Sequence, residues 1–159
     1  MASYPDYPIP TNEPHRLREL ERYGLDNGTD DPQFCRILGL TSEVLQMPIA
    51  MISLLDEHRQ RFLCCHGLDL RSTPRQMAFC AHTIAAEEPL IVADALLDER
   101  FANNPLVVGS PHIRFYAGVP LRTQRGYNLG TLCVADHEPR RFEAHDQHFL
   151  IEFAALLMR

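Results

Sequence analysis

Residues 113–122, which read IRFYAGVPLR, decide the fold. Apolar side chains occupy every second position of this stretch, which is the period of two of a β-strand. The apolar positions are Ile113, Phe115, Ala117, Val119 and Leu121. A turn at Gln124–Asn128 separates this strand from a second apolar run, Leu129–Asp136. Because short turns join antiparallel neighbours, the two runs predict an antiparallel hairpin.

Upstream segments extend this hairpin into a sheet. Ile49–Leu55 is apolar on both faces, as expected for a strand in the centre of a sheet. A turn at Asp56–His58 leads to a strand over residues 60–66, and a short strand is expected at Leu90–Ala93. Strands joined by short turns, with helices between them, predict an α+β fold in which helices pack on one face of an antiparallel sheet of about five or six strands.

Start signals predict the helices. Asn12 stands at an N-cap with Pro14 in the first turn, and Gly24 would end that helix. Asp31 followed by Pro32 starts a second helix, which Pro48 ends. The run from Thr73 to Gln76 matches a capping box, so we expect a helix over residues 74–86. A long helix is expected over residues 142–159.

Two further regions complete the organisation. Residues 94–112 predict a long, partly helical connection, and residues 1–11 form an irregular, proline-rich lead before a single domain over residues 12–159. The last helix has no Gly or Pro stop signal at its end, and Phe149, Phe153 and Leu157 keep it apolar there. This pattern is typical of a module that continues into, or docks on, another element.

Composition excludes several functions. The formal net charge is −6 with 45% hydrophobic and 23% charged residues, which is ordinary for a globular domain and unlike a nucleic-acid binder. The sequence contains no lysine, so Schiff-base chemistry and a P-loop lysine are excluded. No apolar stretch is long enough to cross a membrane, and the first residues do not form a signal peptide. Five cysteines, mostly in apolar runs, favour reduced thiols in the cytoplasm over a disulfide framework.

Several segments in order resemble the GAF branch that precedes histidine kinases, diguanylate cyclases and similar output domains in bacteria. The match covers residues 12–158. Its segments are Pro48–Ala50, Ser53–Asp56, Arg59-Gln60, Gly67-Leu68, Phe79–His82, Asp98–Ala102, Asn104–Val107, Arg114–Leu121 and Leu129–Asp136. Arg61 stands where the branch commonly has Trp, and the signature Asn-Lys-Phe-Asp-Glu of cyclic-nucleotide GAF domains is absent.

The resemblance implies a sensory function. It predicts a small-molecule pocket between the sheet and a helix-loop segment, with occupancy signalled through the terminal helices to an output domain such as a kinase or a diguanylate cyclase, as in two-component systems. It also implies a homodimer formed through the N- and C-terminal helices. We expect no cofactor, no metal, and neither a nucleic-acid nor a membrane partner.

Candidate ligand-binding residues follow from this expected pocket. Cys80 could instead be a small core residue and His82 a helix histidine with its own partner. Asp98 and Arg100 could form a structural ion pair, and Asn104 could hold a turn. Arg114 and Tyr116 could grip an anionic or aromatic ligand, face solvent or form a dimer contact. The full set is Phe79, Cys80, His82, Thr83, Asp94, Arg100, Phe101, Asn104, Arg114 and Tyr116.

Other functions stay open. One is a dimerisation or scaffold module without a ligand, which a closed, side-chain-filled pocket would favour. Another is a cysteine-dependent free methionine sulfoxide reductase, for which Cys64, Cys65 and Cys80 are the plausible thiols. Cys64 and Cys65 point to opposite strand faces and cannot share a metal ion, and His145 with His148 is expected to be a solvated pair.

Overall fold

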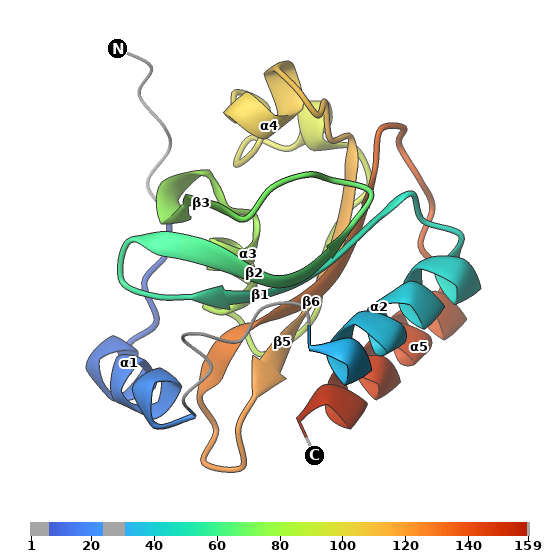
Figure 1. The fold of residues 1–159 in the computed structure, drawn as a ribbon. Helices are drawn as coiled ribbons and strands as arrows, with labels where there is room; N and C mark the ends of the chain where they lie inside the picture. The colour runs from blue at the N-terminus through green and yellow to red at the C-terminus, as the bar shows by residue number, and fades with distance from the viewer. Residues whose placement is uncertain (1–6, 24–30, 159) are drawn as a thin grey trace.

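The computed structural model describes residues 7–23 and 31–158 and contains a six-stranded antiparallel sheet (Figure 1). The strands lie in the order β3-β2-β1-β6-β5-β4. They are β1 (Ile49–Leu55), β2 (Arg59–His66), β3 (Ser72–Pro74), β4 (Leu90–Val92), β5 (Phe115–Arg122) and β6 (Asn128–Asp136). The sequence therefore predicted four of these strands to within two residues at either end and placed β4 one residue too long. The short β3 was not expected.

Two long helices cover one face of the sheet, which we call the helix face. They are α2 (Pro32–Leu45) and α5 (Ala144–Leu157), and Figure 1 shows them side by side. The Asp31 side chain accepts hydrogen bonds from the amides of Gln33 and Phe34, so the predicted start of α2 is confirmed. A capping box between Glu143 and Asp146 starts α5 two residues later than expected. The two helices bury aliphatic side chains against β1, β5 and β6.

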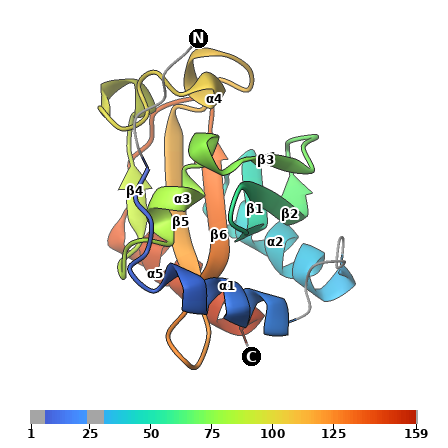
Figure 2. The same cartoon turned by 90° about the vertical axis from the view of Figure 1, so that its left-hand side faces the viewer.

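The other face is covered by the chain between β2 and β5, residues 67–114, which we call the covering segment. Figure 2 shows its helix α3 in front of β5 and β6. Besides β3 and β4 it contains only short elements: η2 (Arg75–Met77), α3 (Cys80–Thr83), η3 (Ala95–Leu97) and α4 (Pro105–Val108). Because both faces are covered, β5 is buried at every position from Phe115 to Leu121.

The helix predicted over residues 74–86 was wrong. Thr73 lies in β3 opposite Gln60, and its hydroxyl donates to Gln60 Oε1 at 3.1 Å instead of capping a helix. The range holds only the single 3-10 turn η2 and, from Cys80, the four-residue α-helix α3. Pairing with β2 therefore overrides the local capping signal.

The first helix, α1 (Glu13–Arg22), crosses one end of the sheet and contacts β6. Asn12 occupies its N-cap position, but the Asn12 side chain makes no capping hydrogen bond. Arg16 is fully buried, pairs with Glu13 at 2.8 Å and donates to the carbonyl oxygen of Asn128 at 3.3 Å. Residues 7–10 form no regular element, whereas residues 1–6 and the stop expected at Gly24 lie outside the described residues.

The expectation of reduced thiols was wrong at one pair. Cys35 of α2 and Cys64 of β2 form a disulfide with their Cα atoms 5.5 Å apart. The pairing joins elements 29 residues apart, so it depends on how α2 lies on the sheet. Cys65, Cys80 and Cys133 are free thiols. Cys65 lies on the opposite face from Cys64, as the strand alternation predicted.

No helix within residues 7–23 and 31–158 is long and apolar enough to span a bilayer.

Candidate functional site

The candidate site is a group of buried hydroxyls and thiols between α3 and the sheet, which we call the hydroxyl–thiol cluster. It combines residues from β1, α3, β5 and β6, and each of them is almost fully buried. Its members are Ser53, Cys80, Thr83, Tyr116, Thr131 and Cys133. Strand pairing brings them together, because Ser53 lies directly opposite Thr131 and Cys133 is two residues further along β6 on the same face.

Cys80 is at the centre of the cluster. Thr131 Oγ1 donates to Cys80 Sγ at 2.9 Å, and Thr131 is itself hydrogen-bonded to Ser53 Oγ at 3.0 Å. The hydroxyl of Tyr116 lies 3.3 Å from Cys80 Sγ, and the Cys133 sulfur lies 3.9 Å away. Two chains of hydroxyl groups therefore converge on one sulfur atom.

Gly118 makes room for the Tyr116 hydroxyl. A Cβ atom at Gly118 would lie 2.1 Å from Tyr116 Oη, so only glycine at this position leaves space for the Tyr116 hydroxyl. The hydroxyl then reaches Thr83 Oγ1 at 2.8 Å as well as Cys80. The local sequence from Tyr116 to Gly118 thus aims the phenol at α3.

The cluster shifts the pKa values of its thiols in opposite directions. Burial raises the pKa of Cys80, but hydrogen bonds from Cys133, Thr131 and Tyr116 outweigh it and hold that pKa below its usual range. The hydrogen bond to Cys80, together with burial, raises the pKa of Cys133. Burial also raises the pKa of Tyr116, so its hydroxyl stays protonated and able to donate. Cys80 is therefore the sulfur that carries negative charge most readily.

A small cavity borders the cluster. Its volume is about 20 Å³, which is room for roughly one water molecule. Cys80 and Tyr116 reach it together with Gln60 and Thr73, and the rest of the wall is apolar. The apolar lining consists of Met51, Phe62, Leu68, Leu70, Phe79, Leu106 and Ile113. This cavity lies between the sheet and the covering segment, where the ligand pocket was predicted, and side chains leave little free space in it.

The predicted aromatic residues pack beside this cavity. Phe79 stacks on Phe101 with ring centroids 4.2 Å apart, and the edge of His82 meets Phe101 at 4.8 Å. Burial and the Arg100 guanidinium lower the pKa of His82. Phe79 also approaches Tyr116, so these side chains connect the cavity wall to the hydroxyl–thiol cluster.

The predicted charged residues lie apart from the cavity. Arg100 pairs with Asp98 at 2.7 Å, as expected for a structural ion pair, and Arg114 pairs with Asp94 at 2.9 Å. Each of these four charges therefore has a protein partner. Asn104 caps α4 by accepting from the Leu106 amide, as expected of a turn residue, and donates to the carbonyl oxygen of Met77 at 2.9 Å.

Sequence reasoning missed half of the cluster. Ser53, Thr131 and Cys133 were not among the candidate residues, nor were Gln60 and Thr73 at the cavity. A usable signal existed for two of them, because Ser53 and Thr131 interrupt otherwise apolar strands. A hydroxyl in such a strand needs a buried partner, but the sequence does not say which.

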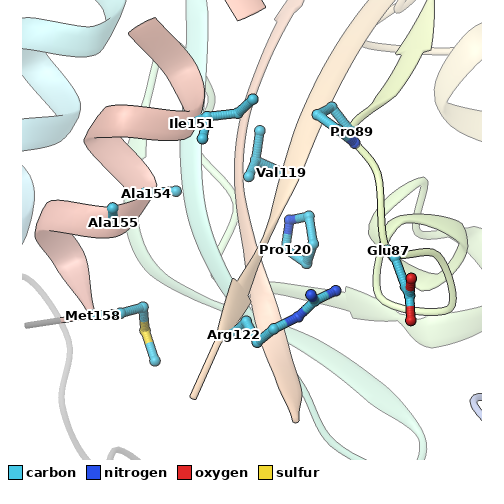
Figure 3. Close-up of a pocket in the computed structure, with 9 residues that line it drawn as sticks. All are labelled: Glu87, Pro89, Val119, Pro120, Arg122, Ile151, Ala154, Ala155 and Met158. Atoms are coloured by element: carbon cyan, nitrogen blue, oxygen red, sulfur yellow. The ribbon is translucent and has the colours of Figure 1, made fainter. Parts of the chain in front are cut away.

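Larger hollows lie on the helix face. An open groove of about 300 Å³ runs between α5 and β5, and Figure 3 shows the helix side chains facing the strand. Its residues are Glu87, Pro89, Val119, Pro120, Arg122, Ile151, Ala154, Ala155 and Met158. A second, apolar hollow of about 160 Å³ lies beside Phe34 and Tyr23, and Tyr23 is the residue that precedes the undescribed residues 24–30. No group of three or more metal-ligating side chains gathers in the described part of the chain.

Comparison with known proteins identifies the family. The model of the GAF domain matches residues 31–159, and the chain belongs to this family. A cyclic di-GMP phosphodiesterase of Pseudomonas aeruginosa is 47% identical over 152 residues, which are 95% of this chain and 26% of that protein. The chain thus spans about a quarter of the length of this relative, and GAF domains occur beside output domains in signalling proteins.

Solved structures agree on the fold. The GAF domain of a phosphoenolpyruvate-protein phosphotransferase from Acinetobacter superposes with a TM-score of 0.66 at 19% identity, covering 94% of this chain and 92% of that one. Free methionine-R-sulfoxide reductase from Neisseria meningitidis, in complex with its substrate, gives 0.67 at 17% identity, covering 99% and 94%. At such identities the likeness establishes the α+β GAF fold alone.

Proposed function

We propose that this chain is the regulatory GAF domain of a cyclic di-GMP signalling protein, in which a small molecule bound under the covering segment controls a neighbouring output domain. The observation that carries the proposal is the 47% identity to a cyclic di-GMP phosphodiesterase over 95% of the chain. That identity extends over the whole domain and not over a single motif, which supports a shared role within a longer protein.

The proposed ligand site is the cavity beside Cys80 and Tyr116. Its mixed wall, apolar with a few converging polar groups, is typical of small-molecule sites. Because only about 20 Å³ is free, a ligand larger than water must displace the side chains contributed by residues 68–70 and 106–113. Binding would therefore be coupled to a movement of the covering segment, which is the condition for signalling by a population shift.

Polar contacts offer a route from the cavity to α1. Asn104 at the start of α4 holds the Met77 carbonyl in η2, and Arg75 in the same short helix pairs with Glu13 of α1 at 2.5 Å. Glu13 also pairs with the buried Arg16, which donates to a β6 carbonyl. A shift of η2 would therefore pull directly on the N-terminal helix.

Exposed apolar side chains support a homodimer formed through the helices. Leu40 and Val44 lie one turn apart on α2, and Phe149 and Leu156 lie two turns apart on α5, each between 42% and 46% exposed. The groove in Figure 3 lies along α5 as well. Replacing both Phe149 and Leu156 by Glu should shift the protein to monomer in analytical ultracentrifugation, whereas replacing the exposed Leu97 in the covering segment should not.

A cytoplasmic location belongs to the same proposal. The free thiols Cys65, Cys80 and Cys133 support it, and the Cys35–Cys64 disulfide is the feature that counts against it.

The proposal is tested by thermal-shift screening with amino acids, short carboxylic acids and nucleotides. A ligand at a hundred times its dissociation constant should stabilise the domain by about 2.7 kcal/mol. The variant Leu70→Trp, which adds volume at the cavity, should lose this stabilisation, and Leu97→Trp on the exposed surface should keep it. Hydrogen exchange should then show protection in residues 68–70 and 106–113 and a change in α1.

A ligand-free dimerisation module is the second candidate, favoured by the closed cavity. If no metabolite stabilises the domain and dimerisation persists, this function replaces the first. Our proposal includes no catalysis, because Cys80 and Cys133 are fully buried and Cys65 is half-buried. Turnover of free methionine sulfoxide with a thiol reductant, lost on Cys80→Ser, would contradict that part.

A further inference from the structure

Cys80 and Cys133 form a pair of thiols whose redox chemistry the proposed sensory function does not use, although Cys80 also borders the proposed ligand cavity. Their sulfur atoms are 3.9 Å apart. Cys80 lies in α3, and Cys133 follows it by 53 residues in β6, where Thr131, 51 residues after Cys80, also contacts the Cys80 sulfur. A disulfide needs a sulfur–sulfur distance of about 2.05 Å. The gap is therefore closed by a movement of roughly 2 Å, on the scale of a side-chain rotation in α3.

The surroundings of Cys80 favour its thiolate. Thr131 donates to Cys80 Sγ at 2.9 Å, and the Tyr116 hydroxyl lies at 3.3 Å with Thr83 behind it. Hydroxyl donors on a sulfur stabilise its ionised form, which is the nucleophile in thiol chemistry. The lowered pKa of Cys80 agrees with this geometry. The pKa of Cys133 is raised, so Cys133 is the second thiol to react.

The size of the cavity beside Cys80 limits which oxidant can reach the two thiols. Both sulfurs are buried, and Cys80 borders a cavity with room for about one water molecule. Hydrogen peroxide has one heavy atom more than water and is the smallest peroxide, whereas an alkyl hydroperoxide or a bulky thiol reagent is several heavy atoms larger. Cys65, the remaining free thiol, is half-buried and lies two strands away from Cys133 across the sheet, with Met51 between them.

We propose that Cys80 and Cys133 are a peroxide-oxidisable dithiol whose disulfide joins α3 covalently to β6. The Cys80 thiolate attacks one peroxide oxygen, so that an S–O bond forms, the O–O bond breaks and the leaving hydroxide takes a proton to become water. Cys133 then attacks the sulfur of the sulfenic acid, and a second water leaves as the S–S bond forms. Two thiols lose two electrons and two protons, and one hydrogen peroxide becomes two waters.

Oxidation would change the covering segment without any ligand. Cys80 Sγ would move from Thr131 and Tyr116 towards Cys133, which removes both hydroxyl contacts from the sulfur. Because α3 contacts β1, β5 and β6, the bond would hold the covering segment against the centre of the sheet. This inference does not rest on the small-molecule proposal, since it needs only the two thiols.

The test is peptide mapping by mass spectrometry after treating the folded domain with hydrogen peroxide. We expect a Cys80–Cys133 linked peptide that disappears on reduction, unaffected by Cys65→Ser. In Cys133→Ala, Cys80 should stop at the sulfenic acid and be trapped by dimedone. Thr131→Val, which keeps the shape but removes a donor, should slow the reaction about tenfold. Tert-butyl hydroperoxide should leave the folded pair unmodified.

Three outcomes would overturn the inference. The first is oxidation of Cys65 alone. The second is a link between Cys65 and either buried thiol in place of the Cys80–Cys133 link. The third is that hydrogen peroxide oxidises Cys80 equally in folded and in urea-unfolded protein, with no link in either. The wild-type peptide map decides among them even where Cys133→Ala does not fold. Loss of the link would leave the small-molecule proposal intact, because the thermal-shift screen reads that site separately.

Discussion

The two faces of the sheet bury polar groups in different ways. On the helix face, Thr41 and Ser42 hydrogen-bond to backbone carbonyls of Ile37 and Met47, close by in the chain, and the rest of the buried cluster is apolar. On the face beneath the covering segment, hydroxyls and thiols from four elements bond to one another. The first face is held by two long helices and the second by short ones.

This difference distinguishes the more stable part of the domain from the part suited to local opening. A buried hydroxyl costs free energy unless it is bonded, and it adds little stability beyond what an apolar side chain would supply. An apolar core under long helices therefore stabilises the domain, whereas a polar cluster under four-residue helices marks the part suited to local opening.

The largest effect is expected from Leu150→Ala on the helix face. Leu150 of α5 is fully buried, so its truncation should lower the free energy of unfolding by about 2–5 kcal/mol. Urea denaturation measures this loss. The exposed Ile151 is the matched control, and Ile151→Ala should cost about 0.5 kcal/mol or less. Equal losses at both positions would show that α5 is not packed as described.

Reduction of the Cys35–Cys64 disulfide should also weaken the helix face. The bond closes a loop with a separation of 29 residues. Its loss is expected to cost about 2–4 kcal/mol by the chain-entropy account. Urea denaturation with and without dithiothreitol measures the difference. Cys35→Ala should be insensitive to the reductant, and a wild-type protein with the same insensitivity would mean that this bond does not stabilise the fold.

Tyr116→Phe should affect the other face mainly by local opening. The hydroxyl's loss leaves Thr83 and Cys80 short of a partner, at a cost of about 1–2 kcal/mol. Hydrogen exchange should speed up in α3 while α2 and α5 keep their protection. The control Tyr127→Phe alters a half-buried ring that packs on the helix-face cluster. Uniformly faster exchange in α3, α2 and α5 would remove the distinction between the two faces.

The smallest effect concerns the ion pair between η2 and α1. Burial raises the pKa of Glu13, but hydrogen bonds from Arg16 and Arg75 outweigh it and lower that pKa from 4.5 to about 2. A depressed pKa stabilises the fold above pH 4.5, and this contribution is lost as the pH falls from 4.5 towards 2. Because the carboxylate is partly solvated, we expect about 1 kcal/mol.

Urea denaturation of wild type and Glu13→Gln across this pH range measures the contribution. The difference between the two proteins should be largest above pH 4.5 and should vanish near pH 2. Glu21→Gln at an exposed position of the same helix is the control, and we expect it to change the free energy of unfolding by about 0.5 kcal/mol or less. A difference that grows on acidification would reverse the assigned sign.

Some elements follow from local sequence alone. The runs at β1, β5 and β6 are mostly apolar over seven to nine residues and end in turns, so burial specifies them wherever they pack. Asp31 before Pro32 specifies the start of α2, because the cap and the proline both act within one turn. The resemblance to GAF domains also came from local motifs in order, and the family comparison confirmed it.

The candidate site depended on contacts that local sequence does not encode. Of the hydroxyl–thiol cluster, the sequence indicated Cys80, Thr83 and Tyr116, whereas Ser53, Thr131 and Cys133 join them only through the register of β1, β5 and β6. Pairing of Thr73 with Gln60 shortened the helix expected from residue 74, and the seating of α2 on β2 made the Cys35–Cys64 bond. Sequence by itself determined every strand except β3, and the family, because periodicity and capping act over a few residues. Only the tertiary structure decided the site and the disulfide, because each joins residues far apart in the chain.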